Sequence, residues 1–172
     1  HNNNISGRVA EIRDEIIQHI GATADEIPFI GELIRLKDDE REWESAIERI
    51  LHNFALRLIV PEKYYRKVNE YVNNHNLRGR IVYQRYNYDA ALREFVNRHA
   101  QDNSLLNKIE FKPNAQYIDW IEDRLYSEFN YTCVDTLEDF NHINEKAVTK
   151  EGLIKAKGGK HEKDDRPEIS RR

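Results

Sequence analysis

The densest group of residues that could do chemistry is the stretch His161-Glu-Lys-Asp-Asp165, in which four of five side chains are potential metal ligands. A catalytic metal site usually gathers its ligands from separate elements, because this fixes their geometry. Adjacent side chains that follow Gly158 and Gly159 point in different directions. A solvated charged surface is therefore favoured over a metal site. A small metal-dependent nuclease or hydrolase stays as the least favoured of the three candidate functions considered below.

The same glycines do not form a nucleotide-binding loop. A P-loop has the pattern G-x-x-x-x-G-K-[ST] between a strand and a helix. Here Gly159-Lys160 is followed by His161, and Ile154 holds the place of the first glycine. The G-x-G-x-x-G, H-E-x-x-H and G-x-S-x-G patterns are also absent. We therefore predict that this chain has no catalytic residue, no metal and no cofactor.

Composition indicates a folded chain with a highly charged surface. The sequence has 172 residues, of which 39% are hydrophobic and 34% charged, and this is enough for one domain or two small lobes. It contains no apolar run of membrane-spanning length. The single cysteine, Cys133, excludes an intrachain disulfide and favours a cytoplasmic setting. The chain begins at His1 and lacks methionine, so we expect it to be a piece of a longer protein.

The charge is uneven along the chain. The net charge is -4, but residues 155–172 contain seven Lys or Arg against four Asp or Glu, which gives this segment +3 and leaves -7 for the rest. A basic segment of this kind is suited to DNA phosphates, so a DNA-contacting module is the second candidate function. Its predicted contacts are Lys155, Lys157, Lys160, Lys163 and Arg166, with Arg78, Arg80 and Arg85 as further candidates.

Apolar periodicity predicts alternating helices and short strands. Val9, Ile12, Ile16 and Ile20 form one stripe of a helix over residues 5–20. Further helices are expected over 39–54, where Asp39 is the predicted cap, and over 61–72, 114–129 and 136–143. Strands are expected over 31–36, 56–60, 80–83, 108–111, 131–134, 147–149 and 153–156. This order predicts a mixed α/β fold.

Two halves of the chain resemble each other weakly. Ile47, Glu48, Leu51 and Val60 match Ile121, Glu122, Leu125 and Val134 at a constant offset of 74 residues. The predicted organisation is a helix at 1–22, lobe I at 23–85, a connection at 86–107, lobe II at 108–159 and a charged return at 160–172. Any helix followed by a strand gives a similar pattern, so the repeat is a hypothesis.

Gly158 and Gly159 follow the predicted strand 153–156 and allow two interpretations. They could form an ordinary turn, or they could end an edge strand that is left bare for a second subunit. The second interpretation predicts a homodimer. Its predicted interface residues are Leu153, Ile154, Ala156, Gly158 and Gly159.

The order of these parts resembles the hinge domain of SMC (structural maintenance of chromosomes) proteins. The resemblance covers residues 29–159. The segments that carry it are GELIRLKDDEREWESAIERILHNFALRLIV, RGRIVY and YTCVDTLEDFNHINEKAVTKEGLIKAKGG. It implies two small pseudo-repeated lobes of short sheets with packed helices, flanked by coiled-coil stubs. It also implies a dimerisation hinge without chemistry of its own, which is the first candidate function.

Other segments look most like the MukB-like SMC subunit (JetC) of Wadjet plasmid-defence complexes. These are PFIGELIRL, RILHNFALRLIVPEKYY, LRGRIVYQRY and GGKHEKDDR. The resemblance implies a parent protein with an ATPase head, which extrudes DNA loops together with other subunits in defence against plasmids. A cytoplasmic, DNA-associated location, weak DNA contact and no membrane partner would follow.

Overall fold

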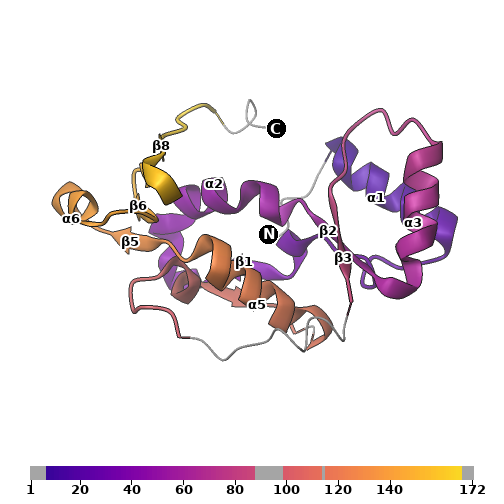
Figure 1. Ribbon diagram of the computed structural model, residues 1–172, viewed down its shortest axis with the longest axis horizontal. Helices are drawn as coiled ribbons and strands as arrows, with labels where there is room; N and C mark the ends of the chain where they lie inside the picture. The colour runs from indigo at the N-terminus through magenta and orange to yellow at the C-terminus, as the bar shows by residue number, and fades with distance from the viewer. Residues whose placement is uncertain (1–6, 88–98, 114, 168–172) are drawn as a thin grey trace. The chain divides into compact units, whose positions relative to one another are not determined.

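The computed structural model describes residues 7–87, 99–113 and 115–167 (Figure 1). Its mixture of helices and short strands confirms the predicted α/β class. The helices are α1 (Gly7–Ile20), α2 (Glu44–Ala55), α3 (Glu62–Asn74), α5 (Ala115–Phe129) and α6 (Leu137–His142). The strands are β1 (Ile34–Leu36), β2 (Leu58–Pro61), β3 (Tyr83–Tyr86), β4 (Ile109–Phe111), β5 (Thr132–Val134), β6 (Ala147–Thr149), β7 (Ile154–Lys155) and β8 (His161–Glu162).

The chain forms two compact units, each built from separated segments. Unit 1 contains His1–Arg35, Asn53–Asn97 and Phe111–Asp123, and unit 2 contains Leu36–His52, Arg98–Glu110 and Arg124–Arg172. The predicted lobes were continuous stretches, and their boundaries stay a prediction. Half of the predicted connection, 88–98, lies outside the described residues, as do both chain ends.

Unit 1 is organised around a parallel pair of strands. Strands β2 and β3 pair with Leu58 opposite Tyr83, and α3 forms the crossover between them. The expected stripe on α1 is correct at its centre, because Ile12 and Ile16 are fully buried there. They pack in one core cluster with Val68 of α3, so α1 belongs to the core of this unit.

Unit 2 contains a four-stranded sheet in the order β5-β6-β7-β8. Strands β5 and β6 are parallel, and β7 is antiparallel to both β6 and β8. Helix α6 lies between β5 and β6 in the chain. Its Phe140 is buried against Val134 and Ala147. As expected for a helix that begins at residue 136, the Thr136 side chain caps α6 by accepting a hydrogen bond from the Asp139 amide at 3.0 Å.

Two predicted strands differ from the observed ones for reasons of tertiary structure. The strand expected over 31–36 begins with a 3-10 turn, Ile30–Glu32, because the Glu32 carboxylate accepts the Phe29 amide at 3.0 Å. The strand expected over 80–83 lies at β3 instead, because the preceding loop turns through Arg78, whose φ is 51°.

The first turn of the second predicted helix also differs. Residues Asp38–Trp43 form a 3-10 helix whose N-cap is Lys37 and not the expected Asp39, and α2 begins only at Glu44.

Strands β1 and β4 form a separate two-stranded sheet. No helix among the described residues is long and apolar enough to cross a membrane.

Candidate functional site

The segment with the two glycines is a β-hairpin in unit 2. A 3-10 turn, Lys157–Gly159, joins β7 to β8, and Gly158 and Gly159 have φ values of 81° and 84°. A Cβ atom on either glycine would meet nothing within 4 Å. The glycines are therefore required by the left-handed backbone of the turn and not by close packing within the chain. The Ala156 amide donates to the Lys160 carbonyl at 2.7 Å and closes the hairpin.

The expectation that strand 153–156 is a bare edge is wrong. Strand β7 is paired on both sides, with β6 through Ile154 and Val148 and with β8 through Ile154 and Glu162. The edge of the sheet is β8, where both side chains are exposed. Sequence reasoning missed this strand because two charged or polar residues carry no apolar pattern.

The predicted interface residues are divided between the core and the surface. Ile154 is buried, and Leu153 is half-buried against the cluster of Val134, Phe140 and Ala147. Ala156 is half-buried, whereas Gly158 and Gly159 are exposed at the tip of the hairpin. Of the five predicted interface residues, the two glycines are thus the exposed ones, and they lie next to the exposed edge strand β8.

Lys155 is placed quite differently from the surface cation that the sequence suggested. Its exposure is 8%, and its ammonium donates to the carbonyls of Phe140 at 2.9 Å and Ile143 at 2.6 Å. The same ammonium lies 4.5 Å from the centre of the Phe140 ring. These carbonyls lie at the end of α6, where no further helical turn follows, and the Phe140 carbonyl also accepts the Ile143 amide at 3.2 Å. Lys155 therefore has a structural role, tying α6 to the sheet.

The other predicted DNA contacts fall into two groups. Lys163 pairs with Asp165 at 2.6 Å and Arg166 pairs with Asp164 at 2.9 Å, so these charges are locally compensated. The Asp164 carboxylate also raises the pKa of Arg166, chiefly through the hydrogen bond. Arg85 similarly pairs with a glutamate, Glu62.

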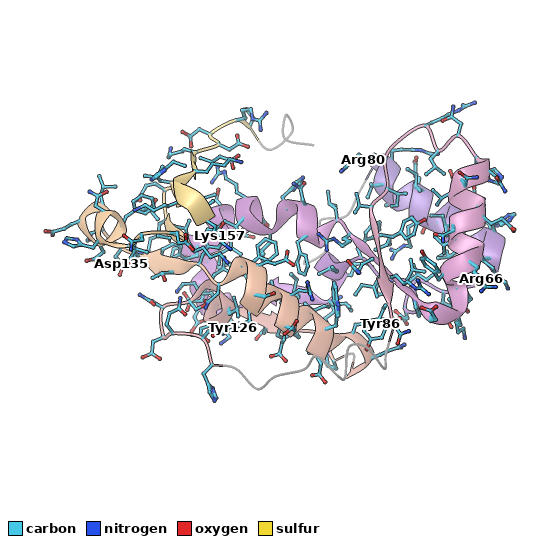
Figure 2. All side chains as sticks on the ribbon, in the orientation of Figure 1. Arg66, Arg80, Tyr86, Tyr126, Asp135 and Lys157 are labelled. Atoms are coloured by element: carbon cyan, nitrogen blue, oxygen red, sulfur yellow. The ribbon has the colours of Figure 1, made fainter. Side chains whose placement is uncertain are left out.

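The second group consists of exposed cations without an ion pair in the described part of the chain. On the hairpin of unit 2 these are Lys157 and Lys160, and on the loop before β3 in unit 1 they are Arg78 and Arg80. Figure 2 labels Lys157 and Arg80. The structure thus brings the two lysines together on one turn and the two arginines together on one loop.

No group of three metal-ligating side chains capable of holding a metal ion is found within residues 7–87, 99–113 and 115–167. In the His161–Asp165 stretch, Asp164 and Asp165 pair with the neighbouring cations Arg166 and Lys163. Cys133 is buried, and this burial raises the pKa of its thiol to about 12. A thiol with such a pKa is almost entirely protonated near neutral pH and is a poor nucleophile.

Unit 1 has an open strand edge as well. One side of β2 pairs with β3. On its other side, the Ile59 amide donates to the Pro28 carbonyl, and the carbonyl of Arg57, just before β2, accepts the Ile30 amide, both at 2.9 Å. Within the described residues β3 pairs with β2 alone. In unit 2 the outer side of β5 is covered, since the Cys133 amide donates to the Asn103 carbonyl at 2.8 Å. In these two sheets, the edge strands to which no further strand pairs within the described residues are therefore β3 and β8.

No family model matches the sequence, and no curated protein matches it. Solved structures, however, resemble the fold. The Pyrococcus furiosus Smc hinge domain with an extended coiled coil superposes with a TM-score of 0.64 at 20% identity, covering 93% of this chain and 56% of that one. This chain thus spans about half the length of that structure.

Two further hinge structures agree. The P. furiosus SMC protein hinge domain gives a TM-score of 0.60 at 19% identity, with 93% of this chain and 91% of that chain covered. An asymmetric dimer of the Geobacillus stearothermophilus SMC hinge domain gives 0.53 at 18% identity, covering 94% and 74%. The chain has the fold of SMC hinge domains.

Proposed function

We propose that this chain is a dimerisation hinge of an SMC-like protein and has no catalytic activity of its own. The observation that carries the proposal is the free edge of β8, an exposed strand on a well-defined hairpin. Backbone groups along such an edge can add a strand from another chain, which provides affinity without a large apolar surface. The likeness of the fold to SMC hinge domains supports a second copy of this chain as the partner.

The two open edges suggest how the contact closes. In the proposed dimer, β8 of one copy pairs with β3 of its partner. A two-fold axis repeats the same contact in the opposite sense, and the assembly then stops at two subunits. Gly158 and Gly159, next to β8, leave room for the approaching backbone. Leu153, Ile154 and Ala156 would support the edge from behind, as part of the strand on which β8 rests.

The register of the hairpin identifies the backbone group to test. The pair Ala156 and Lys160 is hydrogen-bonded, and hydrogen-bonded pairs alternate along an antiparallel ladder. The His161 amide must therefore point outward, away from β7. His161→Pro removes this donor. Lys160 has φ -72° and ψ 132°, an extended conformation that is compatible with a following proline.

The experiment is sedimentation of the wild type, His161→Pro and the matched control His161→Ala, which loses the ring but keeps the amide. The wild type and His161→Ala should dimerise at tens of micromolar, whereas His161→Pro should dimerise at least about tenfold more weakly because one edge bond is lost at each of two contacts. Circular dichroism checks that all three are folded. A monomeric wild type, or equal dimerisation of the two variants, would contradict the proposed edge.

The finer assignment is also a proposal. The segments quoted above support a Wadjet-type SMC subunit, JetC-like, whose ATPase head and partner subunits lie outside this chain and which extrudes DNA loops in plasmid defence. A plasmid-retention assay in cells with the whole system tests it. If His161→Pro in the parent protein restores plasmid retention while His161→Ala does not, the hinge acts in that defence. Unchanged plasmid loss in both would contradict it.

DNA contact is a second candidate function. It is supported by the exposed cations that make no ion pair with any residue that the structure describes, which are Lys157, Lys160, Arg78 and Arg80. Phosphate contacts give binding that weakens steeply with salt. Lys157→Glu with Lys160→Glu should weaken duplex binding in a fluorescence anisotropy titration and reduce its salt dependence. The control, Lys67→Glu with Lys112→Glu, makes the same charge change at other exposed lysines. Equal effects of both pairs would indicate general electrostatics rather than a site.

A further inference from the structure

Helix α1 and the loop between α3 and β3 are joined by a contact that the proposed dimer does not use. Both elements belong to unit 1 (Figure 1). The middle of α1 is fixed by burial of Ile12 and Ile16 in the core. The first turn, from Gly7 to Ala10, is only partly buried. What holds this end of the helix must therefore be sought at the surface.

Arg8 bridges the first turn to the loop. Its guanidinium donates to the Leu77 carbonyl through Nε at 3.0 Å and through Nη2 at 2.6 Å. The same fork donates to both oxygens of Glu15, at 2.9 and 3.2 Å, and to Glu11 at 3.2 Å. Arginine suits this position, since its planar group can serve a carboxylate and a carbonyl at the same time.

The loop is shaped to meet Arg8. A Cβ atom on Gly79 would lie 2.8 Å from Cγ of Arg8 and 3.0 Å from Cδ1 of Ile12. A side chain at position 79 would therefore force Arg8 to shift and Ile12 to give way, and Ile12 is fully buried in the close-packed core. Only glycine lets the loop lie this close to α1.

The backbone before Gly79 is strained in a way that fits the same contact. Arg78 has a φ of 51°, a left-handed conformation that costs a non-glycine residue energy. Its amide donates to the Asn76 side chain at 3.0 Å, which stabilises the turn. A strained residue persists only where its surroundings hold it. Here the turn places the Leu77 carbonyl against Arg8 and Gly79 against Ile12.

We infer that Arg8 and the loop 76–79 form a clamp that fixes the direction in which α1 leaves unit 1. The inference rests on the proposed function in one respect: the resemblance to SMC hinge domains implies flanking coiled-coil stubs, and α1 is taken to lead into one of them. With the clamp closed, the first turns of α1 are rigidly continuous with the core. With it open, the helix is held only from Ile12 onward and its end can swing. The Arg8–Glu15 pair lies within α1 and orients the guanidinium, whereas the bonds to the Leu77 carbonyl join the helix to the loop.

Backbone amide exchange tests the clamp directly. The amides of Glu11 and Ile12 donate to carbonyls of the first turn in an α-helix, so they report its opening. In Arg8→Gln these amides should exchange about tenfold faster than in the wild type, while amides of α3 around Val68 keep their rates. Glu11→Gln is the matched control, because it leaves both the Leu77 and the Glu15 bonds in place.

Gly79→Ala attacks the clamp from the other side and should accelerate the same amides. Unchanged rates at Glu11 and Ile12 in both variants would overturn the clamp. A uniform increase across unit 1 would overturn it too, since that result indicates general destabilisation. The readout lies within one subunit. A monomeric wild type would therefore contradict the dimer but leave this test intact. If the wild type is a dimer and both variants exchange at the wild-type rates, the clamp alone is contradicted.

Discussion

The β2-α3-β3 region of unit 1 and the β5-α6-β6 region of unit 2 are two versions of one arrangement. Each is a parallel pair of strands joined by a helix. The helix has 13 residues in the first and six in the second. Around the first, eight buried residues form one cluster that includes α1. Around the second, the cluster found among the described residues consists of Val134, Phe140 and Ala147. A short helix cannot bury enough apolar surface to hold itself.

Polar contacts take over where the smaller core is insufficient. Helix α6 begins with the Thr136 side-chain cap and ends with two carbonyls bound by Lys155. Helix α3, in contrast, has Pro61 at its N-cap and no side-chain hydrogen bond there. Unit 1 therefore depends mainly on burial, and the α6 region depends on burial and on polar fixation of both helix ends.

The largest effect that follows from this difference concerns Phe140. Phe140→Ala removes a ring that is 2% exposed from a cluster of three buried residues, and should cost about 3–5 kcal/mol of unfolding free energy. Because so few neighbours remain, α6 should open locally. Urea unfolding measures the cost, and amide exchange should show faster rates in residues 137–142 than elsewhere.

Ile16→Ala, in the larger cluster, is the variant whose unfolding free energy and amide exchange are compared with those of Phe140→Ala. It should cost about 2–5 kcal/mol, but its effect should be spread over unit 1, because many neighbours share the cavity. If Phe140→Ala raised exchange evenly through the chain, the two cores would not differ in the way described.

These differences explain which parts of the fold could be predicted from sequence. Helices α1, α3 and α5 follow from apolar stripes that are long enough to show a period, and their predicted bounds are close to the observed ones. The eight residues matched at an offset of 74 lie on α2 and β2 in one half and on α5 and β5 in the other. Local periodicity was sufficient for these elements because burial dominates them.

The candidate site could be predicted only in part. The position of the turn at Gly158 and Gly159 follows from residue type, since the turn requires a positive φ at both positions and glycine adopts it without strain. The edge β8 could not be found, because its hydrogen bonds are backbone groups that leave no side-chain pattern. Lys155 was misplaced on the surface for a related reason. Nothing in a lysine's neighbours along the chain reveals that two carbonyls, 12 and 15 residues away, will receive its ammonium.

Lys155 is expected to give the next largest effect. Lys155→Met keeps the length of the side chain but removes the ammonium from both carbonyls. The Phe140 carbonyl keeps the Ile143 amide as a donor, so the Ile143 carbonyl is the acceptor that loses its partner. A buried acceptor without a partner costs about 1–3 kcal/mol, and we expect about 2 kcal/mol in urea unfolding. Lys157→Met, two residues along on the exposed turn, should change stability by less than about 0.5 kcal/mol. Equal values for the two would show that the contact to α6 contributes nothing.

Unfolding at alkaline pH compares one buried acidic side chain in each unit. Burial raises the pKa of Cys133 from 9.0 to about 12, so the unfolded chain loses this proton at lower pH than the folded chain. Stability is therefore complete below pH 9 and falls as pH rises toward 12, by up to about 1.4 kcal/mol per unit. Cys133→Ala should flatten this part of the curve in urea unfolding at a series of pH values.

In unit 1 the corresponding group is Tyr117, whose pKa is also raised, first of all by burial. Its unperturbed pKa of 10.0 is higher than that of the thiol. Tyr117→Phe loses the hydrogen bond from the hydroxyl to the Glu26 carbonyl and so lowers stability at every pH. Its pH dependence should nevertheless follow that of the wild type until about pH 10, one unit later than for Cys133→Ala. Curves that coincide for the two variants and the wild type would contradict the linkage.

The smallest expected effect separates capping from burial most cleanly. Thr136→Ala removes the oxygen that accepts the Asp139 amide, and the loss of an N-cap costs about 1 kcal/mol. Thr136→Ser keeps that oxygen and should stay within about 0.5 kcal/mol of the wild type in urea unfolding. Helix α3 has no such cap, and its first turn is held by Tyr64, which is 9% exposed. If Thr136→Ala and Thr136→Ser were equally stable, α6 would be held by Phe140 and Lys155 alone, and its start would depend on packing in the same way as α3.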